Sequence, residues 1–126
     1  MKISRAMIFD YLTSITAYVG DNDGAPEDLS EYDEDILNVK LGAEKYGDLD
    51  CFRLAIDYLL THPEANASSY APIHYQYDQE EMKELLNHIK QVIWSTDSML
   101  EREVIDSVEL VDISLTDWWK SRRVKS

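Results

Sequence analysis

The sequence is poor in the residues that would point to a disulfide-bonded, β-rich or membrane-spanning protein. Its 126 residues include a single cysteine, Cys51, so no disulfide can form within the chain. With four glycines and three prolines, the composition favours helices over a turn-rich β fold. Asp10 interrupts the apolar run near the N-terminus, which is too short to cross a bilayer. These absences predict a soluble, cytoplasmic protein that does not enter membranes.

Basic residues are also scarce, and they gather at one end of the chain. Twelve Lys and Arg residues face 25 Asp and Glu residues, which gives a net charge of −13. Residues 1–117 contain all of the acids and eight of the bases, a net charge of −17. Such a charge repels nucleic acid and anionic membranes, so neither is expected as a direct partner. It would instead speed association with a basic protein, by roughly tenfold to a thousandfold at low salt.

The sequence has none of the short motifs that carry common catalytic chemistry. It lacks a glycine-rich phosphate loop, a G-x-S-x-G segment and an H-E-x-x-H segment. Its three histidines, His62, His74 and His88, form no H-x-x-x-H pair. Cys51 beside Phe52 is more typical of a small core residue than of a nucleophile. We therefore predict that the protein is not an enzyme and that it holds no cofactor or metal.

The segment DNDG is the best sequence match to a calcium-binding loop. If Gly24 takes the sixth position of such a loop, Asp21 and Asp23 fall at the third and fifth positions. The first and twelfth positions are then Val19 and Ser30, so two essential ligands are missing. The segment is better explained as a solvated turn, because Asn, Asp and Gly tolerate left-handed backbone angles.

Apolar residues recur at steps of three and four along most of the chain, which is the spacing of amphipathic helices. Ser4 is placed to cap the first helix, and Gly20 and Gly47 are placed to end the first and second. Asp78 and Glu81 resemble a capping box that opens the fourth helix. The sequence thus predicts an all-α fold, a single domain over residues 1–126 built as a compact bundle of four to five helices. The expected helices cover residues 5–19, 26–46, 79–93 and 98–105, together with a third helix that starts at Asp48 or Asp50 and stops before Pro63.

Two further segments show no clear helical period. Residues 62–77 are expected to form a long loop, with a short extended piece at IHYQY. Residues 108–115 fit a helix or a strand, so a small extended element near the C-terminus stays open. Thr116 is expected to cap a last helical turn around Trp118 and Trp119, and these two rings could be core residues or interface anchors.

Negative charge is densest in the segment GDNDGAPEDLSEYDED. Its last fifteen residues, 21–35, hold eight carboxylates and no basic side chain. One tyrosine lies among these acids and three more crowd residues 70–77, and tyrosine is favoured in protein-binding surfaces. The alternative is that these tyrosines cap the core of the bundle. The predicted contact residues are Glu27, Asp28, Glu31, Tyr32, Glu34, Asp35, Tyr70, Tyr75 and Tyr77.

Charge, size and the lack of catalytic motifs together predict an inhibitor of a basic, nucleic-acid-acting protein. In general type the chain resembles the immunity proteins that protect bacteria from their own nuclease toxins, which is the preferred interpretation. It also resembles acidic phage inhibitors of restriction or CRISPR enzymes that mimic DNA, which is the alternative. Residues 26–46 carry a net charge of −5, about one charge per 6 Å of helix against about one per 1.7 Å of duplex DNA. This low linear charge density favours a looser fit to a basic protein over close mimicry of DNA.

Overall fold

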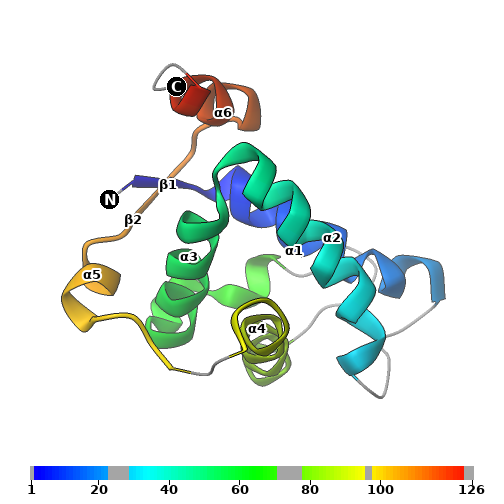
Figure 1. Cartoon of the computed structure of the whole chain (residues 1–126). Helices are drawn as coiled ribbons and strands as arrows, with labels where there is room; N and C mark the ends of the chain where they lie inside the picture. Colours follow the sequence, from blue (N-terminus) through cyan, green and yellow to red (C-terminus); the bar gives the residue numbers. More distant parts are fainter. Residues whose placement is uncertain (1, 23–28, 71–77, 96–97, 124–126) are drawn as a thin grey trace.

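The computed structural model describes residues 2–22, 29–70, 78–95 and 98–123, and most of them are helical (Figure 1). The predicted all-α class is confirmed, since five of the helices in these ranges have nine residues or more. The α-helices are α1 (Arg5–Asn22), α2 (Asp33–Tyr46), α3 (Leu49–Thr61), α4 (Gln79–Trp94), α5 (Arg102–Asp106) and α6 (Leu115–Arg123). Three short 3-10 helices accompany them: η1 (Leu29–Tyr32), η2 (Pro63–Ala65) and η3 (Ala67–Tyr70).

The four long helices α1 to α4 enclose the hydrophobic core. Helix α2 packs against α1 and α4, and α3 packs against α2, α4 and α5. In Figure 1, α4 lies at the bottom of the molecule and α6 at the top. Phe52 on α3 is fully buried, with its ring centroid 5.3 Å from that of Tyr11 and 6.5 Å from that of Trp94. Cys51 is buried beside it, as predicted. Other fully buried core side chains are Ile8, Leu12, Ile36, Ile56, Leu86 and Ile89.

The predicted starts of α1 and α4 are confirmed by their capping hydrogen bonds. The Met7 N–H donates to the Ser4 hydroxyl oxygen at 3.3 Å, which satisfies one of the backbone groups that a helix start leaves open. At α4, the Glu81 N–H donates to Asp78 Oδ1 at 2.8 Å and the Asp78 N–H donates to Glu81 Oε1 at 3.2 Å. The predicted end of α1 is wrong, because the helix runs two residues beyond Gly20. A glycine weakens a helix without necessarily ending it.

The predicted second helix is divided in the structure. Of the predicted helix over residues 26–46, the structure describes residues 29–46. These begin with the 3-10 helix η1, and α2 itself starts at Asp33. Its end is as predicted: Gly47 takes a left-handed backbone angle, φ 73°, and its N–H points to the carbonyl oxygens of Ala43 and Glu44. The expected first turn around Pro26 lies outside the described residues.

A short parallel pair of strands joins distant parts of the chain. Strand β1 (Lys2–Ser4) pairs with β2 (Glu109–Val111), with Ile3 opposite Leu110. The Ser4 hydroxyl also donates to the Ile113 carbonyl oxygen at 2.6 Å. Residues 109–111 are thus the extended element that the sequence left open. Its partner β1 was not predicted, because three residues are too few to show a period of two.

The remaining connections are shorter and more helical than expected. Residues 63–70 of the predicted loop form η2 and η3, whereas the expected extended piece IHYQY lies outside the described residues. Helix α5 has five residues instead of eight. Helix α6 is capped by Ser114 rather than by Thr116, because the Ser114 hydroxyl accepts from the Asp117 N–H at 3.2 Å. Within the described ranges, no helix is both long enough and apolar enough to cross a bilayer.

Candidate partner-binding face

The predicted acidic contacts lie at the N-terminal end of α2. Glu31 on η1 and Glu34 on α2 are exposed, and Asp35 is half-buried. Three acids occupy the first turn of α2, where the helix dipole favours negative charge. These carboxylates therefore stabilise the start of α2 and also concentrate negative potential there. Glu27 and Asp28 lie outside the described residues, and their predicted role stays a prediction.

The predicted tyrosine contacts do not extend this surface. Tyr32 is 1% exposed and Tyr70 is 5% exposed, so neither ring can form an exposed contact with a partner protein in this fold. Tyr32 is buried because it continues the apolar stripe of Ile36 and Val39 into the core. Both tyrosines cap the core, as the alternative interpretation expected, and we leave them out of the proposed face. Tyr75 and Tyr77 lie outside the described residues.

Two exposed leucines supply the apolar part of this face. Leu37 is 46% exposed and Leu41 is 64% exposed. Successive residues of an α-helix are about 100° apart, so both leucines share one side of α2 with Glu34. The sequence held a usable signal, because Leu37 and Leu41 fall outside the apolar stripe that α2 turns to the core. We define the α2 face by its described residues Glu31, Glu34, Asp35, Leu37 and Leu41.

A groove of about 360 Å³ runs between α1 and α2 beside the α2 face. Asp10 and Ser14 line it from α1, and Asp35, Asn38 and Gly42 line it from α2. Burial raises the pKa of Asp10, so its ionised form is disfavoured in the groove. Among the residues that the structure describes, no side chain forms a hydrogen bond or ion pair with the carboxylate of Asp10 or of Asp35. The groove can therefore accept a cationic side chain.

Gly42 adds no side chain to the α2 side of this groove, although nothing in the packing requires a glycine there. A Cβ added at Gly42 would meet no atom within 4 Å. We expect Gly42→Ala to raise the free energy of unfolding by about 1 kcal/mol, because glycine is that much worse than alanine in a helix interior. Urea denaturation measures the change. Gly47→Ala is the control and should lower stability, because Gly47 has a left-handed backbone angle. A loss of stability in Gly42→Ala would show that this side of α2 is not open.

Exposed carboxylates are not confined to the α2 face. They also lie on α4, α5, β2 and α6, as at Glu84, Glu103, Glu109 and Asp117. Negative potential therefore surrounds much of the described surface, and charge alone does not define a docking site. The α2 face differs because exposed leucines and a groove accompany its acids.

Asp48 is fully buried just before α3 and gathers three side-chain donors. The Tyr11 hydroxyl and the Trp119 Nε1–H each donate to Oδ2 at 2.7 Å, and the Trp118 Nε1–H donates to Oδ1 at 3.1 Å. Trp119 also stacks on Tyr46, with ring centroids 4.7 Å apart. Burial and the Asp48 carboxylate raise the pKa of Tyr11, so the phenol stays protonated and donates. This cluster holds α6 against the bundle and places both tryptophans on the core side.

A second buried charge is neutralised inside the protein. Lys90 Nζ lies 2.6 Å from Asp57 Oδ1, and both side chains are fully buried. The other carboxylate oxygen accepts from the Leu100 N–H at 2.9 Å, and Nζ donates to the Ser98 carbonyl oxygen at 3.0 Å. The pair therefore ties residues 98–100 to α3 and α4. Because its partners are all internal, it has a structural role.

The described histidines also have partners within the protein. His88 Nε2 lies 2.6 Å from Asp33 Oδ1, which joins α4 to α2, and His62 Nε2 lies 3.1 Å from Asp106 Oδ1. Across the described ranges, no group of three or more His, Cys, Asp and Glu side chains is placed to hold a metal ion. His74 lies outside these ranges.

Comparison with known proteins adds no relative to this picture. The chain matches no known protein family, no curated protein and no solved structure.

Proposed function

We propose that this protein is a cytoplasmic inhibitor of a basic, nucleic-acid-acting protein, and that the preferred partner is a nuclease toxin against which it confers immunity. The observation that carries the proposal is the α2 face, where exposed leucines lie among carboxylates beside an acidic groove. The net charge of −13 supports the same class of partner, because it attracts basic proteins and repels nucleic acid.

Charge and apolar contact would contribute to different steps of binding. Glu31, Glu34 and Asp35 would speed the encounter through long-range attraction, which depends on salt. Leu37 and Leu41 would hold the complex together, since burying a leucine contributes up to about 1.5 to 3 kcal/mol. Aromatic anchors are more common in such interfaces, and here the leucines take their place.

The groove adds a place for a specific contact. A lysine or arginine side chain of the partner would lie between Asp10 and Asp35 and form hydrogen bonds to Asn38 and Ser14. The ionised form of Asp10 is disfavoured by burial, so a cation placed beside it would relieve that cost. The groove thus fits a basic partner better than it fits an acidic or apolar one.

A nuclease assay against a panel of purified basic nuclease-toxin domains tests the proposal. At least one domain should lose its activity when the protein is added at an equimolar concentration. Inhibition of no domain in a broad panel, with the protein shown to be folded, would overturn the proposal.

The inhibited domain then allows a kinetic test of the α2 face. We expect the triple variant Glu31→Gln, Glu34→Gln, Asp35→Asn to associate about tenfold more slowly at low salt, because these charges steer the encounter. The difference should shrink as salt screens the charges. Stopped-flow fluorescence at several salt concentrations measures the association rate.

A second triple variant controls for the loss of net charge. Replacing the exposed residues Glu101, Glu103 and Glu109 by glutamine removes the same number of charges around α5 and β2, which lie on the opposite side of the molecule from α2 (Figure 1). We expect it to slow association less than the first variant does. Equal slowing by both variants would contradict a specific role for the α2 face and would assign the effect to net charge.

A further inference from the structure

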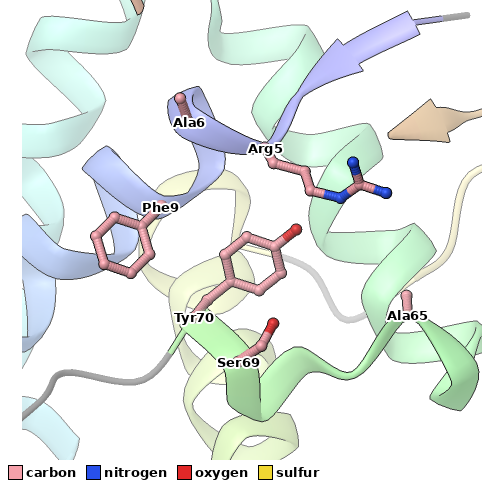
Figure 2. Close-up of a pocket in the computed structure, with 6 residues that line it drawn as sticks. All are labelled: Arg5, Ala6, Phe9, Ala65, Ser69 and Tyr70. Carbon is pink, nitrogen blue, oxygen red and sulfur yellow. The ribbon is translucent and has the colours of Figure 1, made fainter. Parts of the chain in front are cut away.

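A second pocket, of about 340 Å³, lies between the first turns of α1 and the 3-10 helices η2 and η3. Figure 2 shows the Tyr70 hydroxyl pointing toward the Arg5 guanidinium, with Phe9 on the other side of the Tyr70 ring. Three side chains bring polar groups to this pocket, and three others bring apolar surface. The lining residues are Arg5, Ala6, Phe9, Ala65, Ser69 and Tyr70.

Hydrogen-bond donors outnumber acceptors among the side chains that line this pocket. Arg5 carries five N–H donors. Its Nη1 donates to Asp112 Oδ1 at 2.9 Å, and its guanidinium also lies within hydrogen-bonding reach of the Tyr70 hydroxyl. In the part of the chain that the structure describes, neither the Ser69 hydroxyl nor the Tyr70 hydroxyl donates to an acceptor. Burial raises the pKa of Tyr70 above its ordinary value of 10.0 and the Arg5 charge opposes this, so the phenol is a donor at neutral pH. A ligand that brings negatively charged oxygens would satisfy these donors.

The bond from Arg5 to Asp112 does not prevent such a ligand from binding. Both side chains are exposed to solvent, at 46% for Arg5 and 87% for Asp112. Exposed ion pairs of this kind contribute little to stability and rearrange at low cost. The guanidinium also has a planar fork of donors that matches a carboxylate, so it can bind the ligand through two parallel hydrogen bonds.

The other lining side chains are apolar, and the pocket is open to solvent on one side. Phe9 is 41% exposed, and Tyr70 presents an otherwise buried ring beside it. Ala6 and Ala65 leave room between these walls. A volume of this size is at the small end of ligand pockets. The exposed face of the Phe9 ring therefore suits a flat apolar body attached to a charged group, because such a body can stack on it.

We propose that this pocket binds a small organic carboxylate with a flat apolar body, held by Arg5 and the Tyr70 hydroxyl with its body against Phe9. Inorganic anions lack the apolar body, and neutral rings lack the charge, so both should bind less well. The proposal concerns a different face from the α2 face. It does not depend on the proposed inhibition of a nuclease, and either can fail without the other.

Titration of the full chain followed by NMR tests the pocket with three probes. Phenylacetate has both the charge and the ring, phenylacetamide has the ring alone, and acetate has the charge alone. We expect phenylacetate to shift the backbone amide signals of Ala6 and Ser69, with a dissociation constant on the order of 1 mM. The two other probes should bind at least tenfold more weakly. No shift at these amides with phenylacetate, or equal shifts with phenylacetamide, would overturn the proposal.

Variants separate binding in the pocket from general attraction to a basic residue. Arg5→Gln should weaken phenylacetate binding at least tenfold, and Tyr70→Phe should weaken it about fivefold while keeping the buried ring. Arg102→Gln is the matched control, because Arg102 is also exposed and paired with an acid, Asp106, at 3.0 Å. It should leave binding unchanged. Wild-type affinity in both Arg5→Gln and Tyr70→Phe would overturn the proposal, and the Tyr70 variant decides the case if Arg5→Gln does not fold.

Discussion

Replacing Lys90 by methionine should lower the free energy of unfolding by about 3 to 5 kcal/mol, the loss expected when one partner of a buried ion pair is removed. Methionine is one atom shorter than lysine, so it keeps most of the length of the side chain and removes the charge. The Asp57 carboxylate then stays fully buried with no cation, and the Ser98 carbonyl oxygen loses its donor. Urea denaturation followed by circular dichroism measures the change.

Two further variants show whether the charge causes this effect. The double variant Asp57→Asn, Lys90→Met removes the charge of both partners and should recover part of the lost stability, because no unpaired charge remains buried. Arg102→Met breaks the exposed pair with Asp106 and should cost less than about 1 kcal/mol. A loss below about 1 kcal/mol in Lys90→Met would mean that water reaches this pair, which would contradict its burial.

Asp48→Ala should have the second large effect, a loss of about 3 kcal/mol or more. Three donors lose their acceptor, and leaving a buried donor unsatisfied costs about 1 to 3 kcal/mol. Water can reach the half-buried Trp119 more easily than Tyr11 or Trp118, so the total is less than three full penalties. We expect helix α6 to separate from the bundle before the rest unfolds.

Hydrogen exchange and tryptophan emission measure this separation. Amides of residues 115–123 should exchange faster in Asp48→Ala, and the emission maximum should shift to the red, since two of the three tryptophans lie at this cluster. Asp50→Ala is the matched control, because it removes an exposed acid from the first turn of the same helix. Slow exchange over residues 115–123 in Asp48→Ala would contradict the role of the cluster in holding α6.

The parts of the fold that depend on neighbouring residues could be predicted from the sequence. The Asp78–Glu81 capping box and the left-handed Gly47 are local devices, and both lie where their sequence signals placed them. The role of Asp48 could not be predicted in this way. In sequence it looks like the first residue of a helix, whereas its donors Tyr11 and Trp118 lie 37 and 70 residues away. The position of a side chain across the bundle depends on packing that no local pattern records.

In the candidate site too, some features follow from the local sequence and others only from how the helices pack. The acids of residues 31–35 were apparent from their density, and Leu37 and Leu41 could have been found as apolar residues off the core stripe. Tyr32 was misjudged because a position among acids in the sequence does not make a side chain exposed. The groove could not be predicted, since it exists only where α1 and α2 pack side by side.

The pairing of β1 with β2 has a consequence for how the protein folds as it is made. The hydrogen bond from the Ser4 hydroxyl to the Ile113 carbonyl oxygen joins residues that are 109 positions apart. Ser4, at the start of α1, therefore cannot form this bond until residue 113 has left the ribosome. Helices α1 to α4 share local contacts and can assemble earlier, whereas contacts between segments far apart in sequence form slowly. Pairing of β1 with β2 is therefore expected as a late folding step. In a nascent chain halted before residue 109, α1 would be packed in the bundle while β1 still lacked its partner strand.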